Sequence, residues 1–174
     1  MKKLNVLFLC SGNSCRSQMA ESIMKKLAGD KFNVYSAGSR PDLDKYKETK
    51  GVNPTALDLL EKNRFPTENL YSKNWNNFKD HADEFDFVFT LCDKTKSEVD
   101  KGECPVFPGQ PLSAYWGVED PSAVTGTIDE IRAAFLSAFS IIQKRISLFV
   151  SLPIESLEKI ALKQKIIDIG KVQD

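Results

Sequence analysis

The sequence has no excess of charge of one sign and almost no histidine. Lysine plus arginine is 24 and aspartate plus glutamate is 24, so the formal net charge is zero. Because no overall positive field exists to hold nucleic acid or an anionic membrane, any anion must be bound at a local site. The single histidine, His81, lies between Asp80 and Asp83, which predicts a solvated surface residue. We therefore expect neither a nucleic acid nor a membrane as partner.

Long hydrophobic runs and metal-binding cysteine patterns are also missing. The apolar stretch Leu4 to Cys10 is too short for a signal peptide, and no stretch is predicted to be long enough to span a bilayer. The four cysteines form neither a C-x2-C pair nor a Cys/His zinc pattern, so we predict no metal site. A cytoplasmic location is expected. Cysteines there remain mostly thiols, which favours a catalytic over a structural role.

Apolar runs alternate with helical patterns along the chain. Strands are predicted at residues 4–9, 33–37, 86–91 and 106–107. Helices are predicted from residue 14, over 54–62, 93–100 and 127–150, and in a last amphipathic segment that ends at Gly170. Residues 108–121 are predicted to form a loop. This alternation predicts a single-domain, three-layer α/β fold over residues 1–174, with a four-stranded parallel sheet flanked by helices and a C-terminal helical extension from about residue 151.

Apolar spacing predicts which helix faces are buried. Met19, Ile23 and Leu27 are four residues apart in the first helix. The last segment is predicted to bury Leu157, Ile160 and Ile167. For the longest helix, the predicted buried side consists of Ile131, Phe135, Phe139, Ile142 and Ile146.

The most informative segment is Cys10-Ser-Gly-Asn-Ser-Cys-Arg-Ser17. It lies where a parallel strand meets the N-terminus of a helix, the usual ligand position in such sheets. The predicted oxyanion-binding set is Ser11, Gly12, Asn13, Ser14, Cys15, Arg16 and Ser17, whose backbone N–H groups can form an anion nest. Gly12 permits the backbone angles of the turn, and Arg16 can hold two oxygens of a tetrahedral oxyanion. The same field favours the thiolate of Cys10, which predicts an activated nucleophile.

A plainer interpretation of this segment exists. A lone cysteine after a strand is more often a buried apolar residue, and a lone arginine on a helix is usually a solvated charge. Here the C-x5-R spacing also has a glycine within it, a buried strand before it and an amphipathic helix after it. That combination favours the oxyanion site.

The stretch from Val6 to Glu21 resembles the signature of the low-molecular-weight tyrosine phosphatase superfamily. Within that superfamily it is more similar to the thioredoxin-coupled arsenate reductases, because Ser14 and Gln18 stand where the phosphatases more often have an aliphatic residue and proline. Later segments that resemble the reductases are Thr90 to Asp93, Cys104 to Gly109 and Trp116 to Pro121. The resemblance extends to about residue 150.

The resemblance implies arsenate reduction in which Cys10 attacks arsenic, Asp120 is the general acid, and Cys92 and Cys104 relay a disulfide to thioredoxin or a similar thiol reductant. From the residues alone, Asp120-Pro121 would be an ordinary turn. The resemblance also implies that the strands before Cys10 and Cys92 are neighbours, roughly 4.8 Å apart, which suits a disulfide. Cys104 follows Cys92 by twelve residues, a longer spacing than is usual in the reductases, and a buried structural role is its alternative.

Other residues of the loop have lesser implied roles. Ser17 is placed to hydrogen-bond Cys10, Asn13 shapes the loop, and Cys15 packs in the interior. In part of the family the positions of Asn13, Glu21 and Ser36 hold a potassium ion, and the sequence leaves such binding open. No metal or organic cofactor is required for the chemistry, and we expect a monomer. Two alternatives remain: a tyrosine phosphatase that hydrolyses phosphate monoesters through a phosphocysteine, and a non-enzymatic oxyanion-binding protein.

Overall fold

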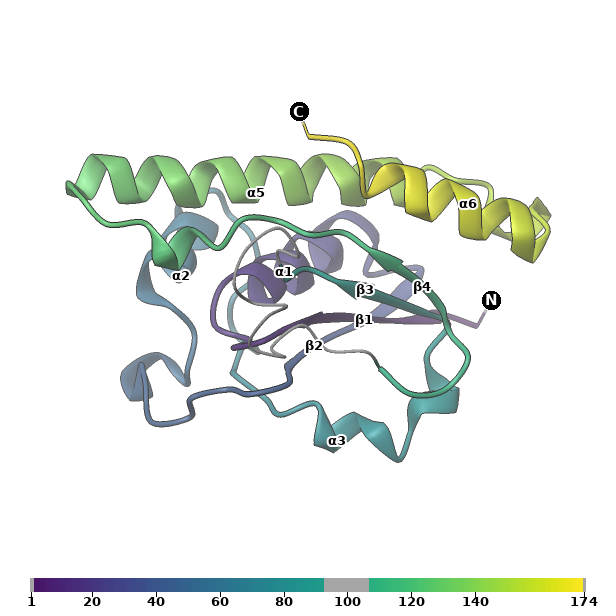
Figure 1. Ribbon diagram of the computed structural model, residues 1–174, viewed down its shortest axis with the longest axis horizontal. Coiled ribbons are helices and arrows are strands. Elements are labelled where there is room, and N and C mark those ends of the chain that lie inside the picture. The colour runs from purple at the N-terminus through teal and green to yellow at the C-terminus, as the bar shows by residue number, and fades with distance from the viewer. Residues whose placement is uncertain (1, 93–106, 174) are drawn as a thin grey trace.

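The computed structural model describes residues 2–92 and 107–173. Four parallel strands form one sheet in the order β2-β1-β3-β4. Their bounds are β1 (Leu4–Cys10), β2 (Phe32–Gly38), β3 (Phe87–Thr90) and β4 (Leu112–Tyr115). This confirms the predicted α/β fold with a four-stranded parallel sheet. Because all strands run the same way, their carboxyl ends lie at one edge of the sheet (Figure 1).

Helices cover both faces of the sheet. They are α1 (Arg16–Ala28), α2 (Pro54–Lys62), α3 (Asn76–Lys79), α5 (Ile128–Val150) and α6 (Lys159–Ile169). In Figure 1, α1, α5 and α6 lie on one face and α3 on the other, which gives the expected three layers. Val6 and Phe8 of β1 pack in the core on the α1 and α5 side, while Leu7 and Leu9 pack on the α3 side. The near-continuous apolar run of β1 is explained by this burial on both faces.

Two helix starts follow from local sequence. The Asn53 side chain caps α2 by accepting from the backbone N–H groups of Thr55 and Ala56, with Pro54 in the first turn. Thr127 and Glu130 form a capping box at the start of α5. These caps explain why the predicted bounds of both helices agree with the structure.

The fourth strand was misplaced in the sequence prediction. Leu112–Tyr115 forms β4 within the stretch predicted to be a loop, and Phe107 is in no strand. The reason is that β4 lies at the edge of the sheet and fully buries only Ala114, so its sequence lacks a strong apolar pattern. Val106 and the helix predicted at 93–100 lie outside the described residues.

Two of the predicted buried residues are exposed. Leu27 is 40% exposed because a four-residue spacing drifts by about 40° per step around a helix of 3.6 residues per turn. Ile160 is 85% exposed, and α6 instead buries Leu162, Ile166 and Ile169. Leu157 and Ile167 of the predicted set do pack against the core, and Ile160 does not because the helix begins only at Lys159, after a separate short turn.

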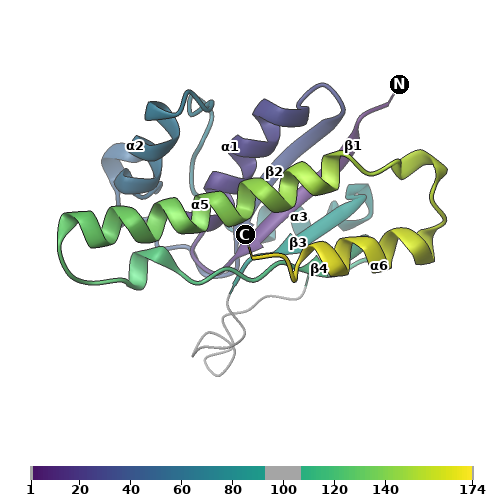
Figure 2. The same ribbon diagram turned by 90° about the horizontal axis from the view of Figure 1, so that it is seen from above.

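The helix α5 corrects a further expectation, since its 23 residues are long and apolar enough to cross a membrane by length and composition. Figure 2 shows it running across the molecule above the sheet. Its inner side contributes Phe135, Phe139 and Ile142 to the main core, as predicted. This packing is that of a core helix.

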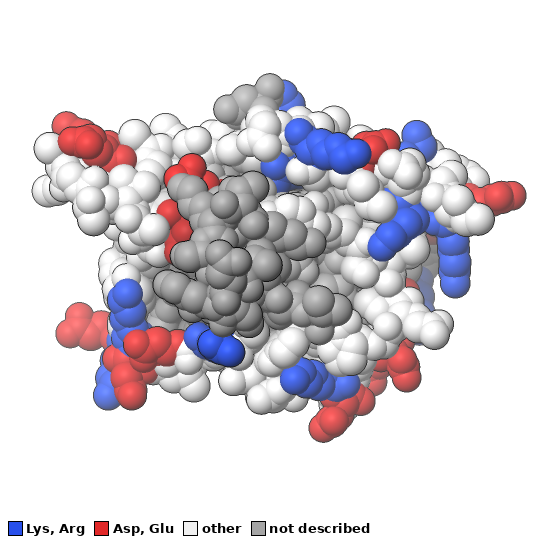
Figure 3. Space-filling model, in the orientation of Figure 1, with Lys and Arg blue, Asp and Glu red and all other residues white. Residues whose placement is uncertain are grey.

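On the face in Figure 3, charged side chains of both signs lie around the rim, in keeping with the zero net charge.

Candidate functional site

The predicted oxyanion loop, residues 11–15, connects β1 to α1. Cys10 is the last residue of β1 and is 2% exposed, and α1 begins at Arg16. Among the described residues, two groups lie within hydrogen-bonding distance of the Cys10 sulfur: the backbone N–H of Asn13 donates to it at 3.1 Å, and the Ser17 hydroxyl oxygen lies 2.9 Å from it. The structure thus places Ser17 against Cys10, where the sequence predicted it.

The special backbone position of the loop is Asn13 rather than Gly12. Asn13 has φ of 50°, in the left-handed region that asparagine tolerates better than most residues. Gly12 is not among the residues with positive φ, and a Cβ there would meet only Ser14 Oγ at 3.7 Å. Glycine is instead required at Gly38, where a Cβ would lie 2.6 Å from the Ser11 carbonyl oxygen. The end of β2 therefore presses directly against the loop and fixes its path.

Arg16 joins the loop to the two segments that face it. It is 3% exposed, and its Nη1 donates to the carbonyl oxygens of Leu91 at 3.3 Å and Val118 at 3.0 Å. Its Nη2 lies 3.7 Å from Oδ2 of Asp120. The guanidinium is therefore held at the carboxyl edge of the sheet, between β3 and the segment that carries the predicted acid.

Asp120 lies at the mouth of the same cavity. Its Oδ1 accepts from the backbone N–H of Ser122 at 2.9 Å and from the Ser122 hydroxyl at 2.7 Å, which caps a short 3-10 turn. The other oxygen faces Arg16, and the side chain is 32% exposed. The turn predicted from Asp-Pro alone is therefore present, and it aims the carboxylate at the oxyanion loop.

A cavity of about 220 Å³ lies between the loop and Asp120. Besides the predicted residues Cys10, Ser11, Gly12, Ser14, Cys15, Arg16 and Asp120, it is lined by Arg40, Asp42, Lys45, Tyr46, Gly51 and Ser122. Sequence reasoning missed Arg40 and Lys45, which lie in the loop that follows β2. The available signal was the position of that loop, because it follows the carboxyl end of β2 at the edge where ligands bind.

Cys15 is a buried thiol of a different kind. Burial raises the pKa of Cys15 to about 12, and the nearby Asp120 carboxylate adds to the shift while Arg16 opposes it. Cys15 is thus held in the protonated form, which is a poor nucleophile. This environment suits the packing role predicted for it.

The pairing of β1 with β3 brings Cys92 close to the loop that follows Cys10. β1 and β3 are neighbours, with Leu9 paired to Thr90, and the Leu91 N–H donates to the Leu9 carbonyl at 2.8 Å. Cys10 therefore ends β1, and the fully buried Cys92 lies two residues beyond the end of the adjacent strand β3. Cys92 is disulfide-bonded, whereas Cys10 and Cys15 are free thiols. Cys104 lies outside the described residues.

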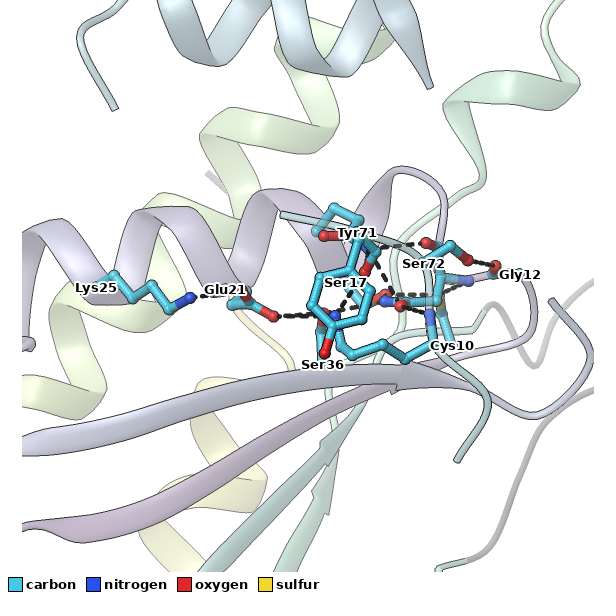
Figure 4. Close-up of polar contacts among 11 residues, drawn as sticks. Cys10, Gly12, Ser17, Glu21, Lys25, Ser36, Tyr71 and Ser72 are labelled. Carbon is cyan, nitrogen blue, oxygen red and sulfur yellow. Dashed lines mark hydrogen bonds and ion pairs between the residues drawn. The ribbon is translucent and has the colours of Figure 1, made fainter. Parts of the chain in front are cut away.

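Behind the loop lies a polar network that the sequence did not predict as a whole (Figure 4). Ser36 Oγ donates to Glu21 at 2.7 Å, and Asn13 Nδ2 donates to Ser36 at 3.0 Å. The buried Lys73 places its ammonium 3.6 Å from the Glu21 carboxylate. Lys73 went unnoticed because nothing in its local pattern distinguishes it from a surface lysine. Within residues 2–92 and 107–173, no three His, Cys, Asp or Glu side chains gather as a metal site.

The comparisons with known proteins agree with this geometry. Residues 5–159 match the low molecular weight phosphotyrosine protein phosphatase family, and the chain belongs to that family. Its curated relatives include the arsenate reductase of Oceanobacillus iheyensis, which is 37% identical over 149 residues, or 86% of this chain and 96% of the relative. Arsenate reductase 1 of Staphylococcus epidermidis is 40% identical over 139 residues, or 77% of this chain and 94% of the relative.

The chain is also similar to solved structures. An arsenate reductase in the phosphate-binding state is 27% identical, with a TM-score of 0.55 over 83% of this chain and 97% of that chain. The tyrosine phosphatase Wzb of Escherichia coli K30, in complex with sulphate, has a TM-score of 0.61 over 84% of this chain and 95% of that chain. At 18% identity, this second likeness shows the fold alone. The family predicted from the loop sequence is confirmed.

Proposed function

We propose that this protein reduces arsenate to arsenite and is reset by thioredoxin. The observation that carries the proposal is the placement of Cys92, fully buried two residues beyond the end of β3, the strand next to the one that ends in Cys10. Hydrolysis of a phosphate ester needs Cys10, Arg16 and Asp120 but no second cysteine beside the first. A disulfide relay within the protein does need one, because reduction of arsenate takes two electrons from a pair of thiols. The arsenate reductases among the relatives support the same choice.

In the first step, arsenate binds in the cavity above Cys10. The backbone N–H groups of the loop and the Arg16 guanidinium hold its oxygens, and the start of α1 adds partial positive charge. The Cys10 thiolate attacks arsenic and a sulfur–arsenic bond forms. Asp120 at the cavity mouth donates a proton to the departing oxygen, which leaves as water.

In the second step, arsenic is reduced. The Cys92 thiolate attacks the Cys10 sulfur, so that a sulfur–sulfur bond forms and the sulfur–arsenic bond breaks. The electron pair of the broken bond stays on arsenic, which changes from the +5 to the +3 state and leaves as arsenite. The two thiols lose two electrons in total and become the Cys10–Cys92 disulfide.

In the third step, Cys104 attacks the Cys92 sulfur and releases the Cys10 thiolate. The resulting Cys92–Cys104 disulfide is then reduced by the dithiol of thioredoxin, which becomes oxidised. The free thiols of Cys10 and Cys15 together with a disulfide-bonded Cys92 fit the stage after this exchange.

A phosphatase is the second candidate, and the family together with the Cys10, Arg16 and Asp120 geometry favours it. The cavity offers the same donors to phosphate as to arsenate. Both reactions would use Cys10 as the nucleophile and Asp120 as the acid. They differ only in what breaks the covalent intermediate, water for phosphate and Cys92 for arsenate.

The deciding experiment is arsenate-dependent NADPH oxidation coupled through thioredoxin and thioredoxin reductase. The wild-type protein, Cys92→Ser and Cys104→Ser are assayed side by side. We expect multiple turnovers for the wild type and none for either variant. Hydrolysis of an aryl phosphate by the same three proteins is the matched control, because it does not pass through the relay.

The two candidates give opposite patterns. Arsenate turnover that survives in Cys92→Ser would rule out the relay. Absence of arsenate turnover in the wild type, with aryl phosphate hydrolysis that both serine variants retain, would establish a phosphatase instead.

A further inference from the structure

Lys73 is a buried lysine directly behind the oxyanion loop. It is only 5% exposed, although lysine is almost never buried unless it is paired. Its ammonium donates to the Tyr71 carbonyl at 2.5 Å and lies 4.2 Å from the centre of the Tyr71 ring. The partner of opposite charge is Glu21, at 3.6 Å. Burial lowers the pKa of Lys73 from 10.5, and the Glu21 charge opposes that shift.

Hydrogen bonds connect this residue to the Cys10 sulfur in a defined direction. The backbone N–H of Lys73 donates to Oδ1 of Asn13 at 2.9 Å, and Gln18 Nε2 donates to the same oxygen at 3.1 Å. Because both partners are N–H donors, the amide atom that they contact must be the oxygen Oδ1 and not the nitrogen Nδ2. Its Nδ2 therefore points the other way, and donates to Ser17 Oγ at 2.7 Å.

The direction of the remaining bond follows. Since Ser17 Oγ already accepts from Asn13, its own proton is free to point at the Cys10 sulfur 2.9 Å away. Figure 4 shows this row of contacts from the segment around Tyr71 to Cys10. The arrangement delivers a hydrogen-bond donor to a thiolate, and it depends on Asn13 being held in place.

The Glu21 carboxylate is the charged end of the same network. It is 3% exposed, accepts from Ser36, and is flanked by Lys25 at 2.6 Å and by Lys73. A buried carboxylate needs a nearby positive charge, because isolation from water is costly. Lys25 is one third exposed, whereas Lys73 supplies its charge from inside.

Asn13, Glu21 and Ser36 also stand at the positions that hold potassium in part of the family. In this protein they do not fit such an ion. Oδ1 of Asn13 is taken by two N–H donors, and Ser36 Oγ both donates to Glu21 and accepts from Asn13. A potassium ion on Glu21 would also lie close to the Lys73 ammonium, where like charges repel.

We propose that the Lys73 ammonium is a built-in counter-ion that holds Glu21 in place and, through Ser36, Asn13, so that the loop presents the Ser17 proton to Cys10 without a bound alkali-metal ion. Lys73 is a positioning residue, since it acts through Asn13 and Ser17 and does not touch the reacting atoms. The inference rests on Cys10 as the nucleophile of the proposed function. In this proposal Lys73 belongs to the hydrogen-bond network that activates the nucleophile.

The test measures thermal unfolding and the rate at which iodoacetamide alkylates Cys10, followed by peptide mass spectrometry. Both are recorded in potassium, sodium and tetramethylammonium chloride at equal ionic strength. We expect the wild type to give the same values in all three salts. Lys73→Met, which keeps the volume and removes the charge, should slow Cys10 alkylation about ten-fold. Lys144→Met, an exposed lysine on α5, is the matched control and should change neither value.

A second variant, Lys73→Ala, leaves space for an ion beside Glu21. Lys73→Ala should lose alkylation rate in sodium and tetramethylammonium and regain part of it in potassium, because the oxygens around Glu21 then become accessible. Should Lys73→Met not fold, Glu21→Gln/Lys73→Met removes both charges together and leaves neither buried alone. That double variant should also show slow alkylation.

Two results would overturn the proposal. One is a wild-type unfolding temperature or alkylation rate that rises specifically in potassium, which would mean that an ion binds beside Lys73. The other is an unchanged Cys10 alkylation rate in folded Lys73→Met. Neither thermal unfolding nor Cys10 alkylation is measured with arsenate present. If both give the expected results but the protein does not turn over arsenate, the proposed function is wrong and the role of Lys73 stands.

Discussion

The reactivity of the Cys10 sulfur is expected to depend on the side-chain hydroxyl of Ser17. Ser17→Ala removes the donor 2.9 Å from the sulfur and, among the residues that the structure describes, leaves the Asn13 N–H as its one donor. A hydrogen bond to a charged group contributes about 1.5–3 kcal/mol, so the alkylation rate of Cys10 at neutral pH should fall at least about ten-fold. Iodoacetamide kinetics measure this, with the exposed Ser140→Ala on α5 as the control. An equal rate in Ser17→Ala and Ser140→Ala would show that the hydroxyl does not stabilise the thiolate.

Cys15 yields a pH prediction with a definite sign. Burial raises the pKa of Cys15 from 9.0 to about 12 in the folded protein. A raised pKa means that the folded state binds the proton more tightly, so this contribution to stability is complete below pH 9 and is lost as the pH rises toward about 12. Urea unfolding of the wild type and Cys15→Ala across that window should show a steeper alkaline decline for the wild type. Parallel declines would refute the assignment.

At the scale of elements, the C-terminal helix is tied to the segment that carries the acid. Arg145 of α5 is 1% exposed, and its Nη1 donates to the carbonyls of Trp116 at 2.7 Å and Gly117 at 3.1 Å. Its Nε donates to the Val172 carbonyl at 2.9 Å, beyond the end of α6. The Trp116 indole N–H in turn donates to the carbonyl of Ile166 in α6. The part of the chain beyond the family match therefore supports the approach to Asp120.

Arg145→Met should therefore destabilise the protein and loosen this segment. The substitution leaves three carbonyl groups without their donor, at a cost of about 2–4 kcal/mol. Urea unfolding measures the loss, and Arg132→Met, an exposed arginine on the same helix, is the matched control. Proteolysis near residues 117–124 should become faster in Arg145→Met. Equal stability of the two variants would mean that the three hydrogen bonds contribute nothing.

The elements also show how much the sequence could predict. β1, α2 and α5 were predicted correctly because strong apolar periods and local caps determine them. β4 was missed because an edge strand with one buried residue has no strong period. In the site, Cys10 and Arg16 belong to one short loop and could be found from local spacing. Lys73 could not, because its burial arises from the bridge between Gly38 and Asn74, a contact between distant segments.

On the scale of the whole molecule, charge is balanced, so the proposed binding of an anion depends on local charges. The net charge is zero and both signs lie around the face in Figure 3, whereas the cavity above Cys10 has Arg16, Arg40 and Lys45 in its wall. A protein built in this way should bind oxyanions by shape and by these few charges, with little contribution from a long-range field. Specific binding of an oxyanion should then be visible as stabilisation of the fold.

Thermal unfolding in phosphate or arsenate, compared with chloride at equal ionic strength, tests this. A ligand at 100 times its dissociation constant stabilises the folded state by about 2.7 kcal/mol, which corresponds to a rise of roughly 5–10 °C for a chain of this size. Arg40→Gln should show a smaller rise at the same concentration, because one charge of the cavity wall is gone. Arg132→Gln removes the same charge from the distant helix α5 and should keep the full rise. Equal reductions in both variants would mean that the oxyanion responds to the total charge of the protein and not to the cavity at the end of β1.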